Sequence, residues 1–422
     1  MNVRILEAGV TFVPQPFATP LHLSSGTIAE TTEARAWTRV AVDGREAVGR
    51  GTIYLGELWS WPDAALAREE RDAAMRRLCE RIAADLPTLC GSEPAHPLEL
   101  GLRLDRGAHE LRLVPDPPEL ARAVCASPFD AAIHDAAGQA MGISAFRLYD
   151  SPAPVPSADR LFPGRGAVAA VRAVLRPPAE RLDAWLVVGQ EEGFAAQIEP
   201  WVRRRRYRCF KLKVLGRDSV EDARHTARVY RAVLDMGARA PRLMSDSNCA
   251  NPDAASVLEY LRCLRSTDQA AFDALEYVEQ PTARDILAHH QDWREVTRLK
   301  PVMLDEGLTG LDLMEPALQQ GWSGFALKTC KGHSFSLVAS AWAREHRLVL
   351  SLQDLTNPGL SAIHAALLAA HVETVNGVEL NSPQFTPAAN AEWLPRLAGL
   401  LDPMDGTHRL PDIWPAGLGS AL

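Results

Sequence analysis

The stretch Phe210-Lys211-Leu212-Lys213-Val214 is the first of five short apolar runs that each end in or near charged side chains. Runs of this length, bounded by Gly, Pro or charge, are typical of buried strands. Each run is followed by a segment long enough for a helix, and this alternation predicts an α/β fold with a parallel sheet. The other four runs span residues 243–248, 275–281, 302–306 and 324–328.

The same alternation extends in both directions and predicts a TIM-like barrel, in which the C-terminal ends of all strands meet at one mouth. Residues 182–188 are predicted as the first barrel strand, with a helix at 194–206. After the five runs, strands are predicted at 349–352 and 378–380. The helices predicted from the second strand onward lie at 220–236, 252–266, 283–298, 311–320, 336–346 and 360–371. Three carboxylates and three lysines would therefore meet at the mouth.

Outside the barrel, the chain has a front domain, a linker and a tail. The front domain contains strands first and helices after, which predicts an α+β capping domain with helices at 62–86 and 128–142. Prolines interrupt residues 151–180, so a linker with one strand near 167–175 is expected there. The irregular tail is expected to pack on the capping domain and complete it. The predicted division is a capping domain at 1–150, a barrel at 151–390 and a tail at 391–422.

The composition argues against several classes of partner. The formal net charge is -8 and the sequence pI is near 5.9, which predicts neither a nucleic acid nor an anionic membrane as partner. The seven cysteines include no Cys-x-x-Cys pair, so neither a disulfide framework nor a zinc site is expected. A reducing, cytoplasmic location is predicted. No uninterrupted apolar run reaches the roughly 20 residues that a membrane span needs.

Asp246, Glu279 and Asp305 belong to three successive runs and lie 33 and 26 residues apart, which is close to one strand–helix unit each. Neighbouring barrel strands would present these three oxygen ligands together, and such ligands suit Mg²⁺. No histidine ends these runs, which argues against zinc. Asp305 and Glu306 are adjacent, so on a strand they would point to opposite faces. Only one of them is expected to face the metal, and the spacing does not decide which.

Lys211 and Lys213 are two residues apart, so both would point to the same face of their strand. Two like charges in a partly dry pocket lower each other's pKa, which would leave one amine neutral and able to act as a base. Lys328 ends a strand roughly opposite. A base on one side of an acidic C–H bond and an acid on the other would catalyse racemisation, with the metal stabilising the enediolate. Lys331 is expected to be a bystander.

These motifs together resemble the mandelate racemase/muconate-lactonising branch of the enolase superfamily. The matching pieces are Lys-x-Lys at 211–213, Asp-x-Asn at 246–248, Glu-Gln-Pro at 279–281, Asp-Glu at 305–306 and the helix at 129–138. The resemblance implies a modified (β/α)7β barrel under an α+β cap, Mg²⁺ as cofactor, assembly into a homo-oligomer, and closure of segments 17–27 and 53–61 over the substrate. The implied site residues are the ligands Asp246, Glu279 and Asp305, the acid/base pair Lys213 and Lys328, and the assisting Lys211 and Asn248.

The departures from the family pattern bear on the substrate. Lysine at the sixth strand, with no histidine at the end of the seventh, is similar to the muconate-lactonising subgroup. Lys331-Gly332-His333 stands where that subgroup has Gly-Gly, and Glu379-Leu380-Asn381 stands where dipeptide epimerases have Asp-x-Asp. Trp59 and Trp61 would serve either as packing residues or as the walls of a loop that covers the substrate. The candidate substrate contacts are Asn248, Asp354, Trp59 and Glu306.

The hypothesis from the sequence is a Mg²⁺-dependent isomerase or lyase that removes the proton α to the carboxylate of a small carboxylic acid, through an enolate. Racemisation or epimerisation, cycloisomerisation and β-elimination all stay open. An alternative within the superfamily is an acid-sugar dehydratase. An alternative of another class is a non-catalytic barrel that binds a ligand through Trp59 and Trp61. A metal-dependent aldolase or hydrolase would need a water-activating group, and no histidine at these strand ends supplies one.

Overall fold

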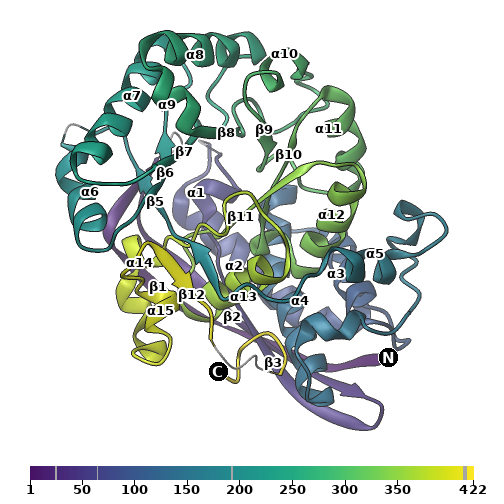
Figure 1. The fold of residues 1–422 in the computed structure, drawn as a ribbon. Helices are drawn as coiled ribbons and strands as arrows, with labels where there is room; N and C mark the ends of the chain where they lie inside the picture. Colours follow the sequence, from purple (N-terminus) through teal and green to yellow (C-terminus); the bar gives the residue numbers. More distant parts are fainter. Residues whose placement is uncertain (24–25, 64, 192, 412–415) are drawn as a thin grey trace.

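A parallel sheet lies at the centre of the structure and is ringed by helices (Figure 1). The computed structural model describes residues 1–23, 26–63, 65–191, 193–411 and 416–422. Within these residues the sheet has seven strands, and strands that are consecutive in the chain pair with each other. This order is expected when a helix returns the chain to the same end after every strand. The strands are β5 (Trp185–Val188), β6 (Cys209–Lys213), β7 (Arg242–Asp246), β8 (Leu275–Glu279), β9 (Val302–Leu304), β10 (Gly324–Lys328) and β11 (Val349–Gln353).

The predicted eighth strand at 378–380 is present only as a short bridge, but it contacts both edges of the sheet. Val378 forms a parallel bridge with Ala184, next to β5, and Glu379 forms one with Gln353 at the end of β11. Glu379 N donates to Leu352 O at 3.0 Å. The two edge strands are therefore connected through this segment, as a barrel requires.

Helices follow the strands and cover the outside of the sheet (Figure 1). The predicted helix at 283–298 is wrong for most of its length, because only the short α10 (Arg294–Thr297) forms there. Asp285 Oδ1 accepts hydrogen bonds from Leu287 N and Ala288 N, which fixes a turn instead. The other barrel helices are α6 (Phe194–Arg203), α7 (Ser219–Asp235), α8 (Ala254–Thr267), α9 (Gln269–Ala274), α11 (Met314–Gln320), α12 (His333–Glu345) and α13 (Gly359–His371).

A layer of buried side chains fills the barrel interior below its mouth. Side chains alternate between the two faces of a strand, so the inward-facing position after each residue of this layer is two residues further along its strand. Those positions hold Lys211, Asp246, Glu279 and Lys328, with Asp305 just past the end of β9. The layer itself consists of Trp185, Cys209, Met244, Tyr277, Met303 and Ala326. Each polar side chain comes two residues after a side chain of this layer. Polar residues far apart in the sequence therefore lie together directly above the layer.

The cap begins with an antiparallel sheet of β1 (Val3–Leu23), β2 (Gly26–Val42) and β3 (Arg45–Tyr54). Segments 17–27 and 53–61, expected as closing loops, lie largely in these strands and in the short α1 (Glu57–Ser60), and Ser24 and Ser25 lie outside the described residues. Three helices follow the sheet: α2 (Arg68–Leu89), α3 (Pro97–Glu110) and α4 (Glu119–Met141).

Two cap helices begin elsewhere than predicted. The helix expected at 62–86 starts at Arg68, because Glu70 Oε2 accepts a hydrogen bond from Ala67 N and so marks the first turn. The helix expected to begin at Pro128 starts at Glu119, and Pro128 lies inside it. Leu120 and Val124, one turn apart, are both buried and extend the apolar pattern before the proline.

The helix α4 ties the cap to the rest of the chain through two acids. Asp130 accepts hydrogen bonds from Ser334 N and Ser334 Oγ at 2.8 Å, at the start of the barrel helix α12. Asp135 accepts from Arg50 N at 2.9 Å and from Leu418 N at 2.7 Å. The sheet strand β3 runs so close to α4 that a Cβ at Gly49 would lie 2.2 Å from Ala132 O, so only glycine fits there.

The linker holds a helix where a strand was expected. Residues 167–175 form α5 (Ala167–Val174), because Ala167, Val168, Ala170, Val171 and Val174 are buried at helical spacing. The short elements of the linker and tail are β4 (Arg181–Asp183), which pairs with β12 (Thr407–Arg409), and α14 (Ser382–Phe385) and α15 (Ala398–Leu401). Single turns of 3-10 helix occur at Ala145–Tyr149, Asp159–Leu161, Leu311–Leu313 and Thr329–Lys331, and a longer one at Pro387–Trp393.

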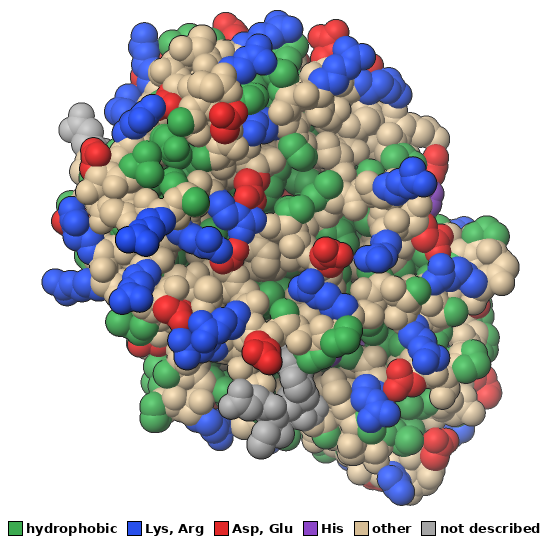
Figure 2. All heavy atoms as spheres, viewed as in Figure 1, with side chains coloured by type: hydrophobic (Ala, Val, Ile, Leu, Met, Phe, Trp, Pro, Cys, Tyr) green, Lys and Arg blue, Asp and Glu red, His purple; other side chains and the backbone are tan. Residues whose placement is uncertain are grey.

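The molecular surface mixes both signs of charge. On the face drawn in Figure 2, Lys and Arg side chains are interspersed with Asp and Glu side chains. None of the described helices has both the length and the apolar character needed to cross a bilayer.

Buried histidines are expected to make the fold sensitive to acid. Burial lowers the pKa of His96 and His408 to about 4 and that of His364 to about 3, against about 6.5 in an unfolded chain. Their stabilising contribution is therefore present above pH 6.5 and is lost as the pH falls toward 4. Lowering the pH from 7 to 5 should cost about 2 kcal/mol of unfolding free energy for each of them, measured by urea unfolding.

A substitution at His364 measures how much of the lost unfolding free energy comes from this one histidine. His364→Leu keeps an apolar side chain of similar size in the core and should lose about 2 kcal/mol less than the wild type over the same pH range. His289 is exposed, so His289→Leu should follow the wild type. Identical pH dependence of all three proteins would show that His364 does not titrate as its burial requires.

Candidate active site

Lys211 lies at the centre of the polar layer above the barrel floor. Its Nζ is 3.0 Å from Glu279 Oε1, 3.1 Å from Asp246 Oδ2 and 3.3 Å from Glu379 Oε2. All four side chains are buried. Burial alone would lower the pKa of Lys211, but Glu279, Glu379 and Asp246 together outweigh it and raise that pKa above its usual range. Lys211 is therefore a charged group that joins three carboxylates.

Lys213 reaches the same aspartate from the rim. Its Nζ donates to Asp246 Oδ2 at 2.6 Å and to Asn248 Oδ1 at 2.9 Å. Burial opposes ionisation of Asp246, but Lys213 and Lys211 outweigh burial and hold its pKa below the usual range. Asn248 and Cys249 have φ values of 47° and 70°, so the chain turns sharply just after β7 and brings Asn248 back over the strand end.

Asp305 is held between two lysines on the other side of the site. Lys328 Nζ lies 3.0 Å from Asp305 Oδ2, and Lys331 Nζ lies 3.0 Å from Asp305 Oδ1. Burial would raise the pKa of Asp305, but Lys328, Lys331 and Lys211 hold it at about 2. Lys331, which was expected to lie near the site without a catalytic role, is buried and contacts a candidate ligand directly.

Glu279 and Lys328 share a partner, Gln353, at the end of β11. Gln353 Nε2 donates to Glu279 Oε2, and Gln353 Oε1 accepts from Lys328 Nζ at 2.6 Å. Burial raises the pKa of Glu279 to about 8, although Lys211 opposes this rise. The amide of Gln353 therefore connects a candidate metal ligand with a candidate acid or base.

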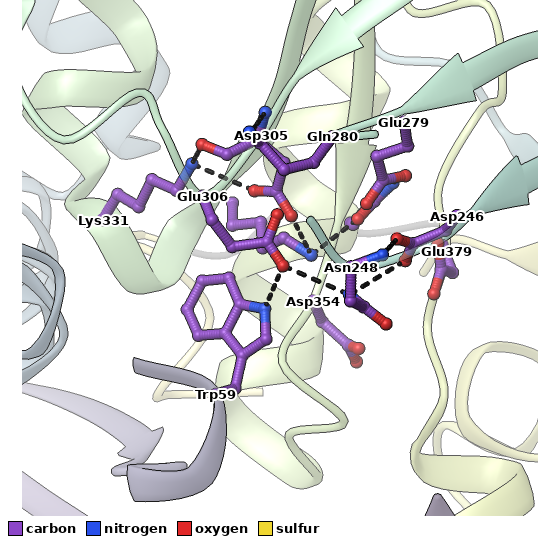
Figure 3. A network of polar contacts seen from close by, with 12 residues as sticks. Trp59, Asp246, Asn248, Glu279, Gln280, Asp305, Glu306, Lys331, Asp354 and Glu379 are labelled. Carbon is purple, nitrogen blue, oxygen red and sulfur yellow. Dashed lines mark hydrogen bonds and ion pairs between the residues drawn. The ribbon is translucent and has the colours of Figure 1, made fainter. Parts of the chain in front are cut away.

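Adjacency on a strand predicted that Asp305 and Glu306 point to opposite faces. This prediction is wrong. The strand β9 ends at Leu304, so both acids lie in the turn beyond it, and both face the mouth (Figure 3). Gln280 Oε1 accepts from Asp305 N at 2.9 Å and from Gly307 N at 3.0 Å, which fixes this turn. Alternation of side chains holds only within the strand.

Glu306 links the cap to the barrel. Its Oε1 accepts from Trp59 Nε1 at 2.9 Å and from Asn248 Nδ2 at 3.2 Å (Figure 3). Lys328 Nζ lies 5.1 Å from the centre of the Trp59 ring, within range of a cation–π contact. Trp59 therefore touches the site, whereas Trp61 packs in the hydrophobic core.

A cavity lies between the cap and the barrel mouth. Asp354 belongs to its wall, apart from the lysine–carboxylate network in Figure 3. Its Oδ1 accepts from Thr356 N at 2.8 Å, and burial raises its pKa to about 8. The described lining residues are Phe17, Leu21, Ile28, Thr31, Tyr54, Gly56, Trp59, Val187, Lys211, Lys213, Asp246, Asn248, Lys328, Asp354, Leu355, Thr356, Glu379 and Asn381.

The expected net lowering of a lysine pKa is wrong for Lys211 and Lys328, because the pKa of each is raised. Burial and Lys211 both act to lower the pKa of Lys328, but Asp305 outweighs them and raises it above the usual range. The carboxylates lie about 3 Å from each ammonium group. The attraction of a carboxylate at contact distance therefore exceeds the repulsion of a second lysine.

Four residues of the site were not predicted as such from the sequence: Gln353, Glu379, Gln280 and Lys331. Gln353 follows the same rule that identified the others, since it is the polar residue that ends the apolar run 349–352. Gln280 acts through a turn whose geometry the sequence does not show.

The carboxylates of the site suit a divalent cation, although lysines contact them in this structure. Among the described residues, no three His, Cys, Asp or Glu side chains are close enough together to hold a metal ion. Glu306 Oε2 is nevertheless buried without a hydrogen bond, and Asp305 Oδ2 has Lys328 Nζ at 3.0 Å as its partner. Asp246 and Glu279 are direct partners in the register of β7 and β8. Hard oxygen donors on neighbouring strand ends fit Mg²⁺.

The solved structures that resemble this chain share its fold. Muconate lactonizing enzyme from Pseudomonas fluorescens, in complex with muconolactone, is 19% identical with a TM-score of 0.64, over 99% of this chain and 96% of that one. Dipeptide epimerase from Enterococcus faecalis V583, with Mg and L-Leu-L-Tyr, is 15% identical with a TM-score of 0.65, over 99% of both chains. An enolase from Bradyrhizobium, with magnesium and mandelic acid, is 15% identical with a TM-score of 0.65, over 99% and 96%.

The sequence comparisons agree with the fold. No curated protein matches the chain. Residues 193–422, more than half of the sequence, match the enolase C-terminal domain-like family. With its antiparallel cap and its parallel barrel sheet, the chain belongs to the mandelate racemase/muconate-lactonising enzyme family of the enolase superfamily.

Proposed function

We propose that this protein is a Mg²⁺-dependent enzyme that removes the proton α to the carboxylate of a small organic acid, giving an isomer or an elimination product. The observation that carries this proposal is the pair Lys213 and Lys328, which contact different carboxylates, Asp246 and Asp305, on separate sides of the network. The strands β6 and β10 are separated by three others in the sheet. A substrate between the two amines would meet one on each face.

In this proposal each residue of the chain has a stated task. Lys213 removes the α-proton, and Lys328 holds or returns a proton on the opposite face. Lys211 stays charged and positions Asp246 and Glu279 through its contacts. Trp59 closes the mouth from the cap and limits access of water to the amines.

Asp246, Glu279 and Asp305 would hold the metal. Two structural neighbours were solved with magnesium, which supports this cofactor. When bound, Mg²⁺ would supply positive charge that stabilises the negative charge developing on the substrate.

Isotope exchange tests the proposal. A panel of chiral carboxylic acids with an α C–H bond is incubated with the protein and MgCl2 in D2O, and loss of the α-hydrogen signal is followed by NMR. We expect exchange of at least one acid to be at least about 100-fold faster with Mg²⁺ than after treatment with EDTA. Exchange that persists equally without the metal would contradict the proposal.

A further inference from the structure

We propose that the substrate of this site carries a single carboxylate on an apolar tail, and that the cavity rejects acids with a second carboxylate. This inference rests on the proposed function, because it concerns the same cavity. It depends on where the cavity has positive charge and where it has none.

All the positive charge in the described lining lies on the barrel side. The lysines that line the cavity are Lys211, Lys213 and Lys328, and each contacts Asp246, Glu279 or Asp305. These cations serve the end of the substrate that reacts. No other described residue of the lining carries a positive charge.

The cap side of the cavity is apolar and aromatic. Phe17, Leu21 and Ile28 come from the hairpin of β1 and β2. The ring centroid of Phe17 lies 6.3 Å from that of Tyr54 and 6.2 Å from that of Phe385, with the rings tilted. Ser24 and Ser25 and the side chains of His22 and Leu23 lie outside the described residues, so the wall is defined by the described side chains. A tail that reaches this wall loses water without gaining a cation.

The remaining wall is acidic and offers a second carboxylate no cation. Asp354 and Glu379 line it together with Asn381, whose Nδ2 donates to Glu379 Oε1 at 2.6 Å. Asn381 N also lies 3.4 Å from both carboxylate oxygens of Asp354. The donors on this wall are therefore engaged by its own acids, and an unpaired charge buried beside them is costly.

This distribution separates the chain from one group of its structural neighbours. The Pseudomonas fluorescens neighbour was solved with muconolactone, and its name refers to muconate, a dicarboxylate. The described lining of the cavity offers a dicarboxylate no further cation for its second charge. Apolar surface buried under Phe17, Leu21 and Ile28 would instead favour a neutral tail. The same apolar wall gives the hydroxyls of an acid sugar few partners.

Matched pairs of acids test the inference on the wild-type protein. The pairs are mandelate with 4-carboxymandelate, and N-acetylleucine with N-acetylglutamate, each titrated calorimetrically in the presence of MgCl2. The member with one carboxylate should bind at least about tenfold more tightly in each pair. Equal or tighter binding of the dicarboxylates, or no binding of the single-carboxylate members, overturns the inference.

A positive charge placed on the cap wall tests whether the lack of a cation there causes the preference for a single carboxylate. Leu21→Lys adds a cation to the lining, and it should reduce or reverse the preference within each pair. Val48→Lys makes the same kind of change at an exposed position and should leave the preference unchanged. An unchanged preference in Leu21→Lys would overturn the assignment of the cap wall as the selecting surface.

The two proposals fail in different ways. Exchange of α-hydrogens in D2O is followed for the same four acids. If the dicarboxylates exchange as fast as their partners, the proposed chemistry stands and the inference is wrong. If the single-carboxylate acids bind more tightly but none exchanges, the inference stands and the proposed chemistry loses its support.

Discussion

Replacing Lys213 with alanine is expected to slow exchange of the substrate α-hydrogen with solvent deuterium by a factor of about 10³. Lys213 is the proposed base, and its Nζ contacts Asp246 and Asn248 at the cavity wall. Removing the amine leaves the three candidate ligands in place, so Mg²⁺ should still bind. The measurement is NMR of the α-hydrogen signal, with calorimetry of Mg²⁺ binding to the same variant.

The control for this change is Lys300, which lies outside the site. Lys300 Nζ lies 4.5 Å from the ring of Phe272, away from the cavity lining, so Lys300→Ala should exchange within about twofold of the wild type. Lys328→Ala should slow exchange mainly for the opposite enantiomer. Full exchange activity in Lys213→Ala, with the metal bound, would refute its role as base.

The use of lysine in this chain is itself a signal of the site. Only five of its 45 basic residues are lysines, and four of these, Lys211, Lys213, Lys328 and Lys331, are in the polar network. Arginine stays protonated at any accessible pH, whereas a lysine amine can lose its proton. A chain that uses arginine almost everywhere else keeps lysine where proton transfer is proposed. The scarcity of lysine in the sequence therefore points to Lys331 as well as to the three lysines that were predicted.

The parts that the sequence predicted correctly are those that follow a period. The strands at 209–213, 242–246, 275–279 and 324–328 coincide with the apolar runs to within two residues at each end, and their inward positions follow from alternation. Alternation also fixes which face each lysine takes, and both Lys211 and Lys213 reach Asp246.

The parts that failed are short local segments and contacts between residues far apart in the sequence. The helix at Ala167–Val174 and the turn fixed by Asp285 were misassigned because both segments are short and their hydrogen bonds compete with propensity. The pKa of Lys328 depends on Asp305, which is distant in the sequence. Gln280 acts by holding the turn that carries Asp305, a role visible only in three dimensions.

The change with the largest expected effect on the metal is Glu279→Gln, which should weaken Mg²⁺ binding by at least about 100-fold. Glu279 has no exposed surface, and its carboxylate lies between Lys211 and Gln353. Glutamine keeps the size of the side chain but removes the charge that would hold the cation. Calorimetric titration with MgCl2 measures the affinity. Mg²⁺ should also raise the melting temperature of the wild type and not that of the variant.

The same strand supplies the matched control. Glu276 precedes Glu279 by three residues on β8, so it faces the outside of the barrel, where Arg242 contacts it through two nitrogens. Glu276→Gln removes the same charge from the same strand and should leave Mg²⁺ affinity unchanged. If both variants bind Mg²⁺ as the wild type does, Glu279 is not a ligand, and the lysine–carboxylate network would then be a structural ion cluster whose charges are already balanced without a metal. If only Glu279→Gln loses the metal, the position of its carboxylate inside the barrel, set by the two-residue period of β8, accounts for the difference.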